Sequence, residues 1–363
     1  MFDRITVTAD LLRPFPRGAE WESATWKNTR WLRQMLQPAL LALGHAPATL
    51  AWDERIGEAP DRYFDTPALY HRLGLDITPA NLARLACSPT APAALVEALD
   101  DALGDALVIG YELPPAMLDA LQQLRRPYVD VVLHPWRFLP DLVFALHSNQ
   151  PDWQAAFEAQ RLPVSVAEQQ AALIQAKAAW MAPPMDLPPG TALVLGQVPG
   201  DRAVAQANGG FASLQDHLAA LHRLCVEHPL VLYKPHPYAG PDDPSAAAVR
   251  QLPAIRTVDH NFYHLLAQPE LDTVVALNSS GLVEAQVFGR RAHNLIPFLY
   301  DFQGGSPASP VALDSRWTQP GFWQPLLAPG KASAQAATRL ADQALRRAMH
   351  ADWGYGFIDK VCA

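Results

Sequence analysis

Cysteine is scarce in this 363-residue sequence, and its three copies, Cys87, Cys225 and Cys362, lie far apart. None belongs to a CxxC pair or to a Cys/His cluster with the ligand spacing of a zinc site. The sequence therefore predicts neither a disulfide framework nor a structural zinc, and a reducing compartment fits best.

A concentrated basic segment is also missing. The chain has 28 Lys and Arg against 36 Asp and Glu, which gives a formal net charge of −8. Nucleic-acid binding depends on a dense basic surface, so we expect no nucleic-acid partner. A local basic pocket for a phosphorylated ligand remains compatible with this overall charge.

Long apolar runs are absent as well, although half of the residues are hydrophobic. No window approaches the roughly 18 apolar residues of a membrane span, and the N-terminus lacks the pattern of a signal peptide. We therefore expect a well-cored globular protein in the cytoplasm, with peripheral membrane contact left open.

Short apolar runs alternate with helical patterns in both halves of the chain. The expected strands are 4–9, 48–52, 105–111, 127–133, 191–198, 229–235, 272–278 and 293–298. The expected helices are 24–42, 66–73, 79–86, 92–103, 114–124, 151–180, 211–226, 261–268, 280–289 and 331–350. This alternation is typical of parallel sheets covered by helices on both faces.

The proline-rich segment 181–190 is the strongest candidate for a domain boundary. We therefore expect an α/β protein of two doubly wound, Rossmann-like domains, 1–185 and 186–335. A C-terminal helix and tail, 336–363, are expected to pack back on the N-terminal domain. In such sheets ligands bind beyond the carboxyl ends of the strands.

Polar residues follow one expected strand in the segment HPLVLYKPHPYAG, residues 228–240. Lys234 and His236 come directly after the apolar run, and each precedes a proline that restricts it to extended conformations. An imidazole held in this way suits the donation of a hydrogen bond or a proton to a phosphate. The alternative is a structural turn with an exposed lysine.

A second polar group lies in VALNSSGLVEAQVFG, residues 275–289. Asn278, Ser279 and Ser280 stand between an expected strand and an expected helix, where hydroxyls and free backbone N–H groups favour an anion. Glu284 lies one turn further on and could reach a ribose, or simply cap the helix. Together with the KPHP segment, this pattern predicts a nucleotide-phosphate pocket.

Three further segments place polar residues at strand ends. Asp201 follows the strand that ends at Gln197, in a Pro-Gly turn where an aspartate commonly does no more than bond its own backbone. Glu112 ends another strand in GYELP, and Arg137 follows the next one. An arginine can pair with a sugar carboxylate through two parallel hydrogen bonds, although an ion pair between elements is the alternative for each residue.

These motifs resemble those of a known group of bacterial enzymes. KPHP and the Asn-Ser-Ser-Gly segment are similar to the "HP" and "SS" motifs of transferases that use CMP-activated 2-keto sugars. GYELP (110–114), VVLHPWRF (131–138) and GQVPGD (196–201) resemble β-Kdo glycosyltransferases of the KpsC, KpsS and WbbB type. The likeness covers strand ends from about 108 to 298. Arg202 departs from it, because the capsule enzymes more often carry a small polar residue there.

The resemblance implies a GT-B-like fold with two Rossmann-like domains facing an interdomain cleft. It implies transfer of Kdo from CMP-β-Kdo to a glycan or glycolipid acceptor in capsule, O-antigen or lipopolysaccharide synthesis. The expected mechanism retains the β configuration by double displacement and uses neither cofactor nor metal. Partners are then the donor, the acceptor and polysaccharide-assembly proteins, with peripheral contact at the inner membrane left open.

Roles for the candidate residues follow from the same resemblance. Asp201 is expected to be the nucleophile and Glu112 the acid/base, while His236 stabilises the departing CMP phosphate. The expected substrate-binding residues are Lys234, Ser279, Ser280 and Asn278 around the phosphate, Glu284 on the ribose, Arg137 on the sugar carboxylate, and Gln197.

Two other readings of the sequence stay open. One is an inverting CMP-sialic-acid-type transferase or a CDP-glycerol-type polymer transferase, in which no covalent intermediate forms on Asp201. The other is a non-catalytic polysaccharide-assembly module that keeps the serine pocket.

Overall fold

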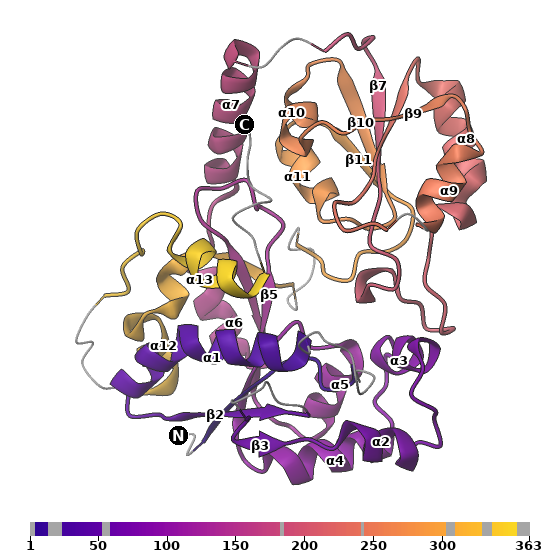
Figure 1. Cartoon of the computed structure of the whole chain (residues 1–363). Helices are drawn as coiled ribbons and strands as arrows, with labels where there is room; N and C mark the ends of the chain where they lie inside the picture. The colour runs from indigo at the N-terminus through magenta and orange to yellow at the C-terminus, as the bar shows by residue number, and fades with distance from the viewer. Residues whose placement is uncertain are drawn as a thin grey trace.

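Strands and helices alternate along the chain, and the strands gather into two separate sheets in the computed structural model (Figure 1). The structure describes residues 4–13, 24–52, 59–181, 185–240, 243–302, 309–328 and 336–353. Within these ranges one sheet has seven strands and the other has five. The α/β fold class expected from the alternation is confirmed.

The first sheet has the order β12-β6-β5-β4-β1-β2-β3. β1 to β5 run parallel, β6 is antiparallel to β5, and β12 is antiparallel to β6. Its strands are β1 (Ile5–Thr8), β2 (Pro47–Ala51), β3 (Arg62–Tyr63), β4 (Leu107–Tyr111), β5 (Tyr128–Leu133), β6 (Phe144–Ser148) and β12 (Val311–Leu313). The run β3-β2-β1-β4-β5 is the order of a Rossmann half-sheet, with its switch point between β1 and β4.

The second sheet has the order β11-β10-β7-β8-β9 and is parallel throughout. Its strands are β7 (Thr191–Leu195), β8 (Val231–Lys234), β9 (Ile255–Thr257), β10 (Leu271–Ala276) and β11 (Arg291–Asn294). Read from β9, this is the same Rossmann order, with the switch point between β7 and β10.

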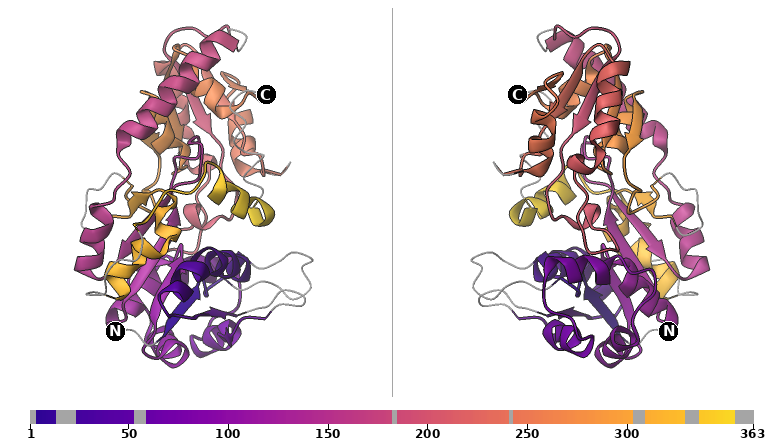
Figure 2. Two further views of the ribbon diagram at one scale, coloured as in Figure 1. Left: turned by 90° about the vertical axis from the view of Figure 1, so that its left-hand side faces the viewer. Right: turned by 90° about the vertical axis from the view of Figure 1, so that its right-hand side faces the viewer.

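Helices cover both faces of both sheets. One face of the first sheet is covered by α1 (Ala24–Ala42), α6 (Pro151–Glu158), α12 (Pro320–Leu327) and α13 (Ala344–Trp353). The other face is covered by α2 (Thr66–Arg72), α4 (Ala93–Leu103) and α5 (Pro115–Gln123), and α3 (Pro79–Ala86) lies beside α5. The second sheet lies between α7 (Val164–Met181), α10 (Phe262–Ala267) and α11 (Gly281–Val287) on one face and α8 (Leu218–Glu227) and α9 (Pro244–Arg250) on the other (Figures 1 and 2). Three short 3₁₀ helices are η1 (Arg202–Val204), η2 (Leu214–His217) and η3 (Ser315–Thr318).

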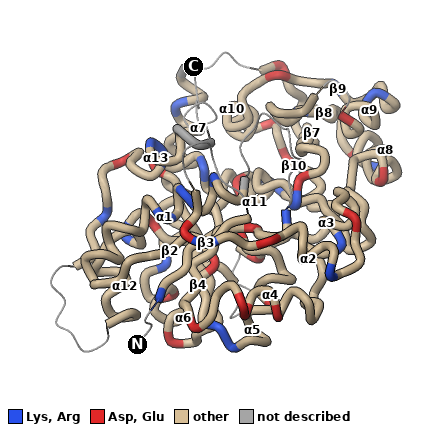
Figure 3. Tube along the Cα trace, turned by 60° about the horizontal axis from the view of Figure 1, so that its bottom comes forward, with Lys and Arg blue, Asp and Glu red and all other residues tan. Residues whose placement is uncertain are grey.

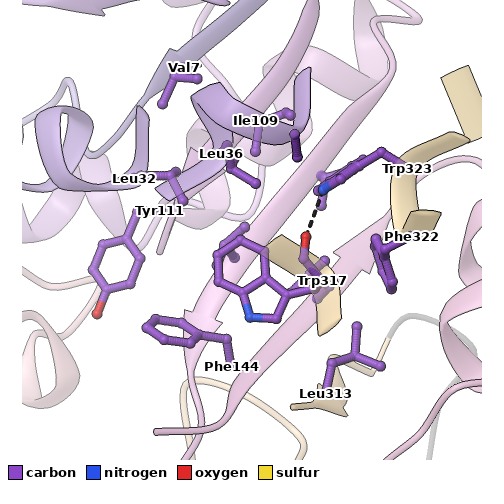
Figure 4. Close-up of a cluster of buried hydrophobic side chains, with 14 of the residues drawn as sticks. Val7, Leu32, Leu36, Ile109, Tyr111, Phe144, Leu313, Trp317, Phe322 and Trp323 are labelled. Carbon is purple, nitrogen blue, oxygen red and sulfur yellow. Dashed lines mark hydrogen bonds between the residues drawn. The ribbon is translucent and has the colours of Figure 1, made fainter. Parts of the chain in front are cut away.

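Aromatic side chains pack among aliphatic ones in one core of the first sheet (Figure 4). Trp31, Trp317 and Trp323 are almost fully buried there. The indole Nε1 of Trp323 donates to the carbonyl oxygen of Trp317 at 2.6 Å, so this polar group is satisfied inside an apolar cluster. The core therefore joins α1 to η3 and α12, which lie almost three hundred residues further along the chain.

The C-terminal part of the chain returns to the first sheet. β12 extends that sheet next to β6, and Phe322 and Leu327 of α12 belong to the same core. The sequence predicts this segment in the second domain, so its placement differs from the expectation. The reason is that three buried residues on a sheet edge give no signal of the sheet to which they belong.

The C-terminal helix also packs against the first sheet, with Leu345 and Met349 in its core. It begins at Ala344, whereas the sequence predicts a helix from 331. Residues 331–335 of the expected helix and 354–363 of the expected tail lie outside the described residues.

Charged residues of both signs are scattered over the helices and loops around both sheets (Figure 3). No helix among the described residues is sufficiently long and apolar to cross a membrane.

Candidate active site

A cavity of about 380 Å³ lies where the two switch points meet. Its walls come from α1 and the loops that follow β1, β4 and β5 of the first sheet, and from the loops that follow β7, β8, β10 and β11 of the second. Eight predicted site residues line it: Glu112, Arg137, Gln197, Asp201, His236, Asn278, Ser279 and Ser280. Lys234 and Glu284 are not part of this lining.

The KPHP loop is held close to the end of β7. The backbone N–H of Gly196 donates to the carbonyl oxygen of Lys234 at 2.8 Å. A Cβ atom on Gly196 would lie 2.7 Å from the hydroxyl oxygen of Tyr233 and 3.0 Å from the backbone nitrogen of His236. Only glycine fits here, because any side chain would push the two loops apart.

The imidazole of His236 is fixed by its own loop. Its Nδ1 accepts a hydrogen bond from the backbone N–H of Tyr238 at 3.1 Å, so in the neutral ring the proton is assigned to Nε2. Burial and the nearby Arg137 lower the pKa of His236, while Asp201 and Asp243 act in the opposite direction. Near neutral pH the ring is therefore a neutral Nε2–H donor on the cavity wall.

Lys234 ends β8 but lies outside the cavity lining. Burial lowers the pKa of this half-buried lysine, and the carboxylate of Asp259 partly offsets that effect. The side chain therefore lies outside this cavity, and its contact with a phosphate stays a prediction. A strand-end position does not fix the direction in which a long side chain extends, so the sequence alone could not show this.

Gln197 and Asn278 bind each other across the second switch point. The side-chain Nε2 of Gln197 donates to Oδ1 of Asn278, and the backbone N–H of Asn278 donates to Oε1 of Gln197, both at 2.9 Å. Asn278 Nδ2 donates to the carbonyl oxygens of Ala203 and Pro297. These amides therefore tie the loops after β7 and β10 together at the cavity wall, and their direct role in substrate binding stays a prediction.

Ser279 and Ser280 lie on the cavity wall just before α11. Ser279 Oγ accepts from the backbone N–H of Gly281 at 3.2 Å, and its hydroxyl proton can still be donated. A Cβ atom on Gly281 would lie 2.9 Å from Leu195 Cδ1, so glycine lets α11 approach β7 closely. The two serines are thereby held at the strand ends.

Glu284 is buried, with 3% of its surface exposed. Its Oε1 accepts from the backbone N–H of Arg137 at 3.0 Å and from the hydroxyl of Tyr263 at 2.9 Å. Burial raises the pKa of Glu284 to about 7, against the opposing effects of Arg137 and Tyr263. The carboxyl group thus holds the loop of Arg137 and does not line the cavity, and its predicted contact with a ribose stays a prediction.

Glu112 has an unusual backbone, with φ of +47°. This left-handed conformation is costly for a residue with a side chain, and such strain concentrates at functional sites. Its N–H donates to the carbonyl oxygen of Val131 at 2.9 Å, and the next N–H, of Leu113, donates to Asp130 Oδ1 at 2.8 Å. Burial raises the pKa of Asp130 to about 7, while the Leu113 amide and Arg202 oppose that rise.

Asp201 is the N-cap of η1 and is exposed on the cavity wall. Its Oδ1 accepts from the backbone N–H of Ala203 at 2.8 Å, the local bond expected of a turn aspartate. This bond fixes the carboxylate, and the cavity brings it together with Glu112 and His236.

Several cavity residues were not predicted from the sequence. Asp10 and Arg13 follow β1, and Tyr300 and Phe302 come from the segment after β11. Asp10 comes directly after the expected strand 4–9, so the strand-end argument used for Glu112 could have identified it. Tyr300 lies in no recognisable pattern, and only the fold brings it to the cavity.

No cluster of three or more His, Cys, Asp or Glu residues suited to a metal ion occurs in the described ranges. The expectation of a reaction without metal or cofactor stays a prediction.

No protein-family model matches the chain, and no curated protein matches its sequence. One similar solved structure is Thermosulfurimonas dismutans KpsC, beta Kdo 2,7 transferase, with 16% identity, a TM-score of 0.32, and coverage of 54% of this chain and 67% of that one. The KpsC beta Kdo 2,4 transferase of the same organism has 12% identity and a TM-score of 0.36 over 80% and 79%. A glycosyltransferase from Rickettsia africae ESF-5 has 10% identity and a TM-score of 0.37 over 84% and 82%. Similarities this low do not assign a family.

Proposed function

We propose that this protein is a glycosyltransferase that moves Kdo from CMP-β-Kdo to a glycan or glycolipid acceptor with retention of configuration. One observation carries the proposal: a single cavity gathers Glu112, Asp201 and His236 with Ser279 and Ser280. Two carboxylates and a neutral imidazole donor, beside two hydroxyls, are the groups that such a transfer needs.

The donor is anionic, and the cavity offers groups that match it. CMP-Kdo carries a phosphodiester and a sugar carboxylate. The Nε2–H of His236 and the hydroxyls of Ser279 and Ser280 suit the phosphate, while Arg137, which lines the same cavity, suits the carboxylate. Arg13 adds a further cation to the lining, although the whole chain is acidic.

The first displacement uses Asp201. One carboxylate oxygen attacks C2 of the sugar as the bond from C2 to the phosphate oxygen breaks, and CMP leaves with the electron pair. The transition state has oxocarbenium character, which a carboxylate stabilises and then traps as a glycosyl ester. A hydrogen bond from His236 to the phosphate makes CMP a better leaving group.

The second displacement uses Glu112. The acceptor hydroxyl attacks C2 from the opposite face, its proton passes to Glu112, and the Asp201 carboxylate is released. The sugar returns to its original configuration because two inversions have occurred.

The test is intact-protein mass spectrometry after mixing the enzyme with CMP-Kdo in the absence of acceptor. We expect a mass increase of one Kdo that maps to Asp201 and is missing in Asp201→Asn. Asp314→Asn is the matched control, because Asp314 caps η3 by accepting from the N–H two residues later, as Asp201 does in η1. The control should form the adduct at the wild-type rate.

Other results identify the alternatives. Release of CMP only with acceptor, and no adduct, would indicate a single displacement of the inverting type. Binding of CMP without adduct or CMP release would refute Kdo transfer and favour another donor or a non-catalytic assembly module. Activity with CDP-glycerol in place of CMP-Kdo would identify the polymer transferase.

A further inference from the structure

Arg202 connects the two sheets inside the cavity. It follows Asp201 directly, yet its side chain extends to the opposite wall and is only 12% exposed. One terminal nitrogen, NH1, donates to the backbone carbonyl oxygen of Glu112, and the other, NH2, donates to the hydroxyl oxygen of Tyr300 at 2.9 Å. The same NH2 lies 3.8 Å from Oε2 of Glu112.

The surroundings of Arg202 keep it charged in spite of its burial. Burial lowers the pKa of the guanidinium, but Tyr300 and the carboxylates of Asp10, Glu112 and Asp130 together raise it above the ordinary value. A buried arginine is tolerated when hydrogen bonds and opposite charges surround it, and here both are present. Cys87 is also close enough for Arg202 to lower its pKa, against the larger effect of burial.

The contact falls on a strained point of the backbone. Glu112 has the left-handed φ of +47°, and its carbonyl group is the one that accepts from Arg202. The neighbouring N–H groups are held by Val131 and Asp130 of the first sheet. Arg202 adds the bond that comes from the second sheet, so the conformation of Glu112 depends on both sheets.

We propose that Arg202 is a positioning residue that sets the place of Glu112 relative to Asp201. The argument rests on the proposed function, because it gives those two carboxylates their roles. We call the contacts from the Arg202 guanidinium to Glu112 the tether. Since residues 201 and 202 are adjacent, the loop that carries the nucleophile also carries the tether to the acid/base. A lysine could supply the charge but not two donors in a planar fork, so it replaces only part of the contact.

The two half-reactions should respond differently to loss of this tether. Adduct formation requires Asp201 and the departure of CMP, whereas discharge of the adduct requires Glu112 to take the proton of the acceptor. In Arg202→Gln we expect adduct formation within about threefold of wild type and discharge slowed by roughly 10- to 100-fold, the cost of a misplaced catalytic group. The discharge rate of Arg202→Lys should fall between those of wild type and Arg202→Gln.

Arg84→Gln is the matched control. Arg84 also joins the two sheets' loops, through a bond from its Nε to the carbonyl oxygen of Asn208 at 3.2 Å, but it does not line the cavity. We expect both half-reactions of this variant to stay within threefold of wild type.

Rapid-quench kinetics with mass detection would measure the two steps, and thermal unfolding would confirm that each variant is folded. Equal slowing of both steps in a folded Arg202→Gln, or an unchanged discharge, would overturn the positioning role. If the wild type itself forms no adduct, the proposed function fails instead.

The tether can then still be tested by hydrogen exchange. Arg202→Gln should speed exchange of the Glu112 and Leu113 amides and leave that of β9 unchanged. Unchanged exchange at Glu112 and Leu113 would overturn the tether whatever the activity.

Discussion

The buried carboxyl group of Glu284 allows a sharp test of how the site is built. The change is Glu284→Gln. Glutamine retains an oxygen that can accept from the Arg137 N–H and the Tyr263 hydroxyl, while it cannot ionise. The substitution therefore removes the ionisable group and keeps the hydrogen-bond acceptor, so the difference between the two proteins reports the ionisation of Glu284.

The sign of the effect follows from the pKa of Glu284, which is raised from 4.5 to about 7. The folded protein then holds this proton more tightly than the unfolded chain does. The contribution of Glu284 to the free energy of unfolding is therefore largest below pH 4.5 and declines as the pH rises to about 7. At about 1.4 kcal/mol per unit, the loss is on the order of 3 kcal/mol.

Urea unfolding of the wild type and of Glu284→Gln between pH 4.5 and 8 would measure this loss in the free energy of unfolding. Other titrating groups, such as Asp130 and His134, contribute equally to both proteins and cancel in the difference. We expect the stability of wild type minus that of Glu284→Gln to fall by roughly 3 kcal/mol over this range. A difference that does not change with pH would contradict the assignment of a buried, protonated carboxyl group.

Two further predictions concern the KPHP loop. Gly196→Ala should destabilise the protein by about 1–3 kcal/mol in urea unfolding and weaken CMP binding, because the new methyl group collides with Tyr233 and the His236 backbone. The control Gly240→Ala should leave stability unchanged, because nothing lies within 4 Å of the added atom. Equal stabilities of the two variants would contradict the close approach at Gly196. His236→Ala should lower kcat by roughly 100- to 10,000-fold in a CMP-release assay, while the exposed His222→Ala should not; a loss below tenfold would exclude His236 as the donor to the leaving group.

The sequence predicts the regular parts of the fold well. The helices at 24–42 and 79–86 agree with α1 and α3 at both ends. The strands of both Rossmann half-sheets lie within four residues of the expected ranges, except the short strands β3 and β9, which the sequence does not predict. Buried parallel strands are continuous apolar runs, so they can be seen without knowledge of their neighbours. The same reasoning locates the cavity, because strand-end residues of both sheets meet at the switch points.

What the sequence leaves out depends on long-range contacts. β6 and β12 pair antiparallel at the edge of the first sheet, and the sequence predicts neither strand. Gln197, Asn278 and Glu284 are polar residues at the predicted positions, but their hydrogen bonds go to protein atoms. A motif gives the position of a residue and not the identity of its partner.

Arg137 shows how far these partners reach. Its backbone N–H is bound by Glu284 of α11, and its carbonyl oxygen accepts from NH2 of Arg346 in α13 at 2.8 Å. Arg346 donates also to the carbonyl oxygen of Leu139 in the same loop. Elements 147 and 209 residues away therefore hold the loop that brings Arg137 to the cavity. If Arg137 recognises the carboxylate of the donor sugar, that recognition depends on the second sheet and on the C-terminal helix together, although the motif around Arg137 belongs to the first sheet alone.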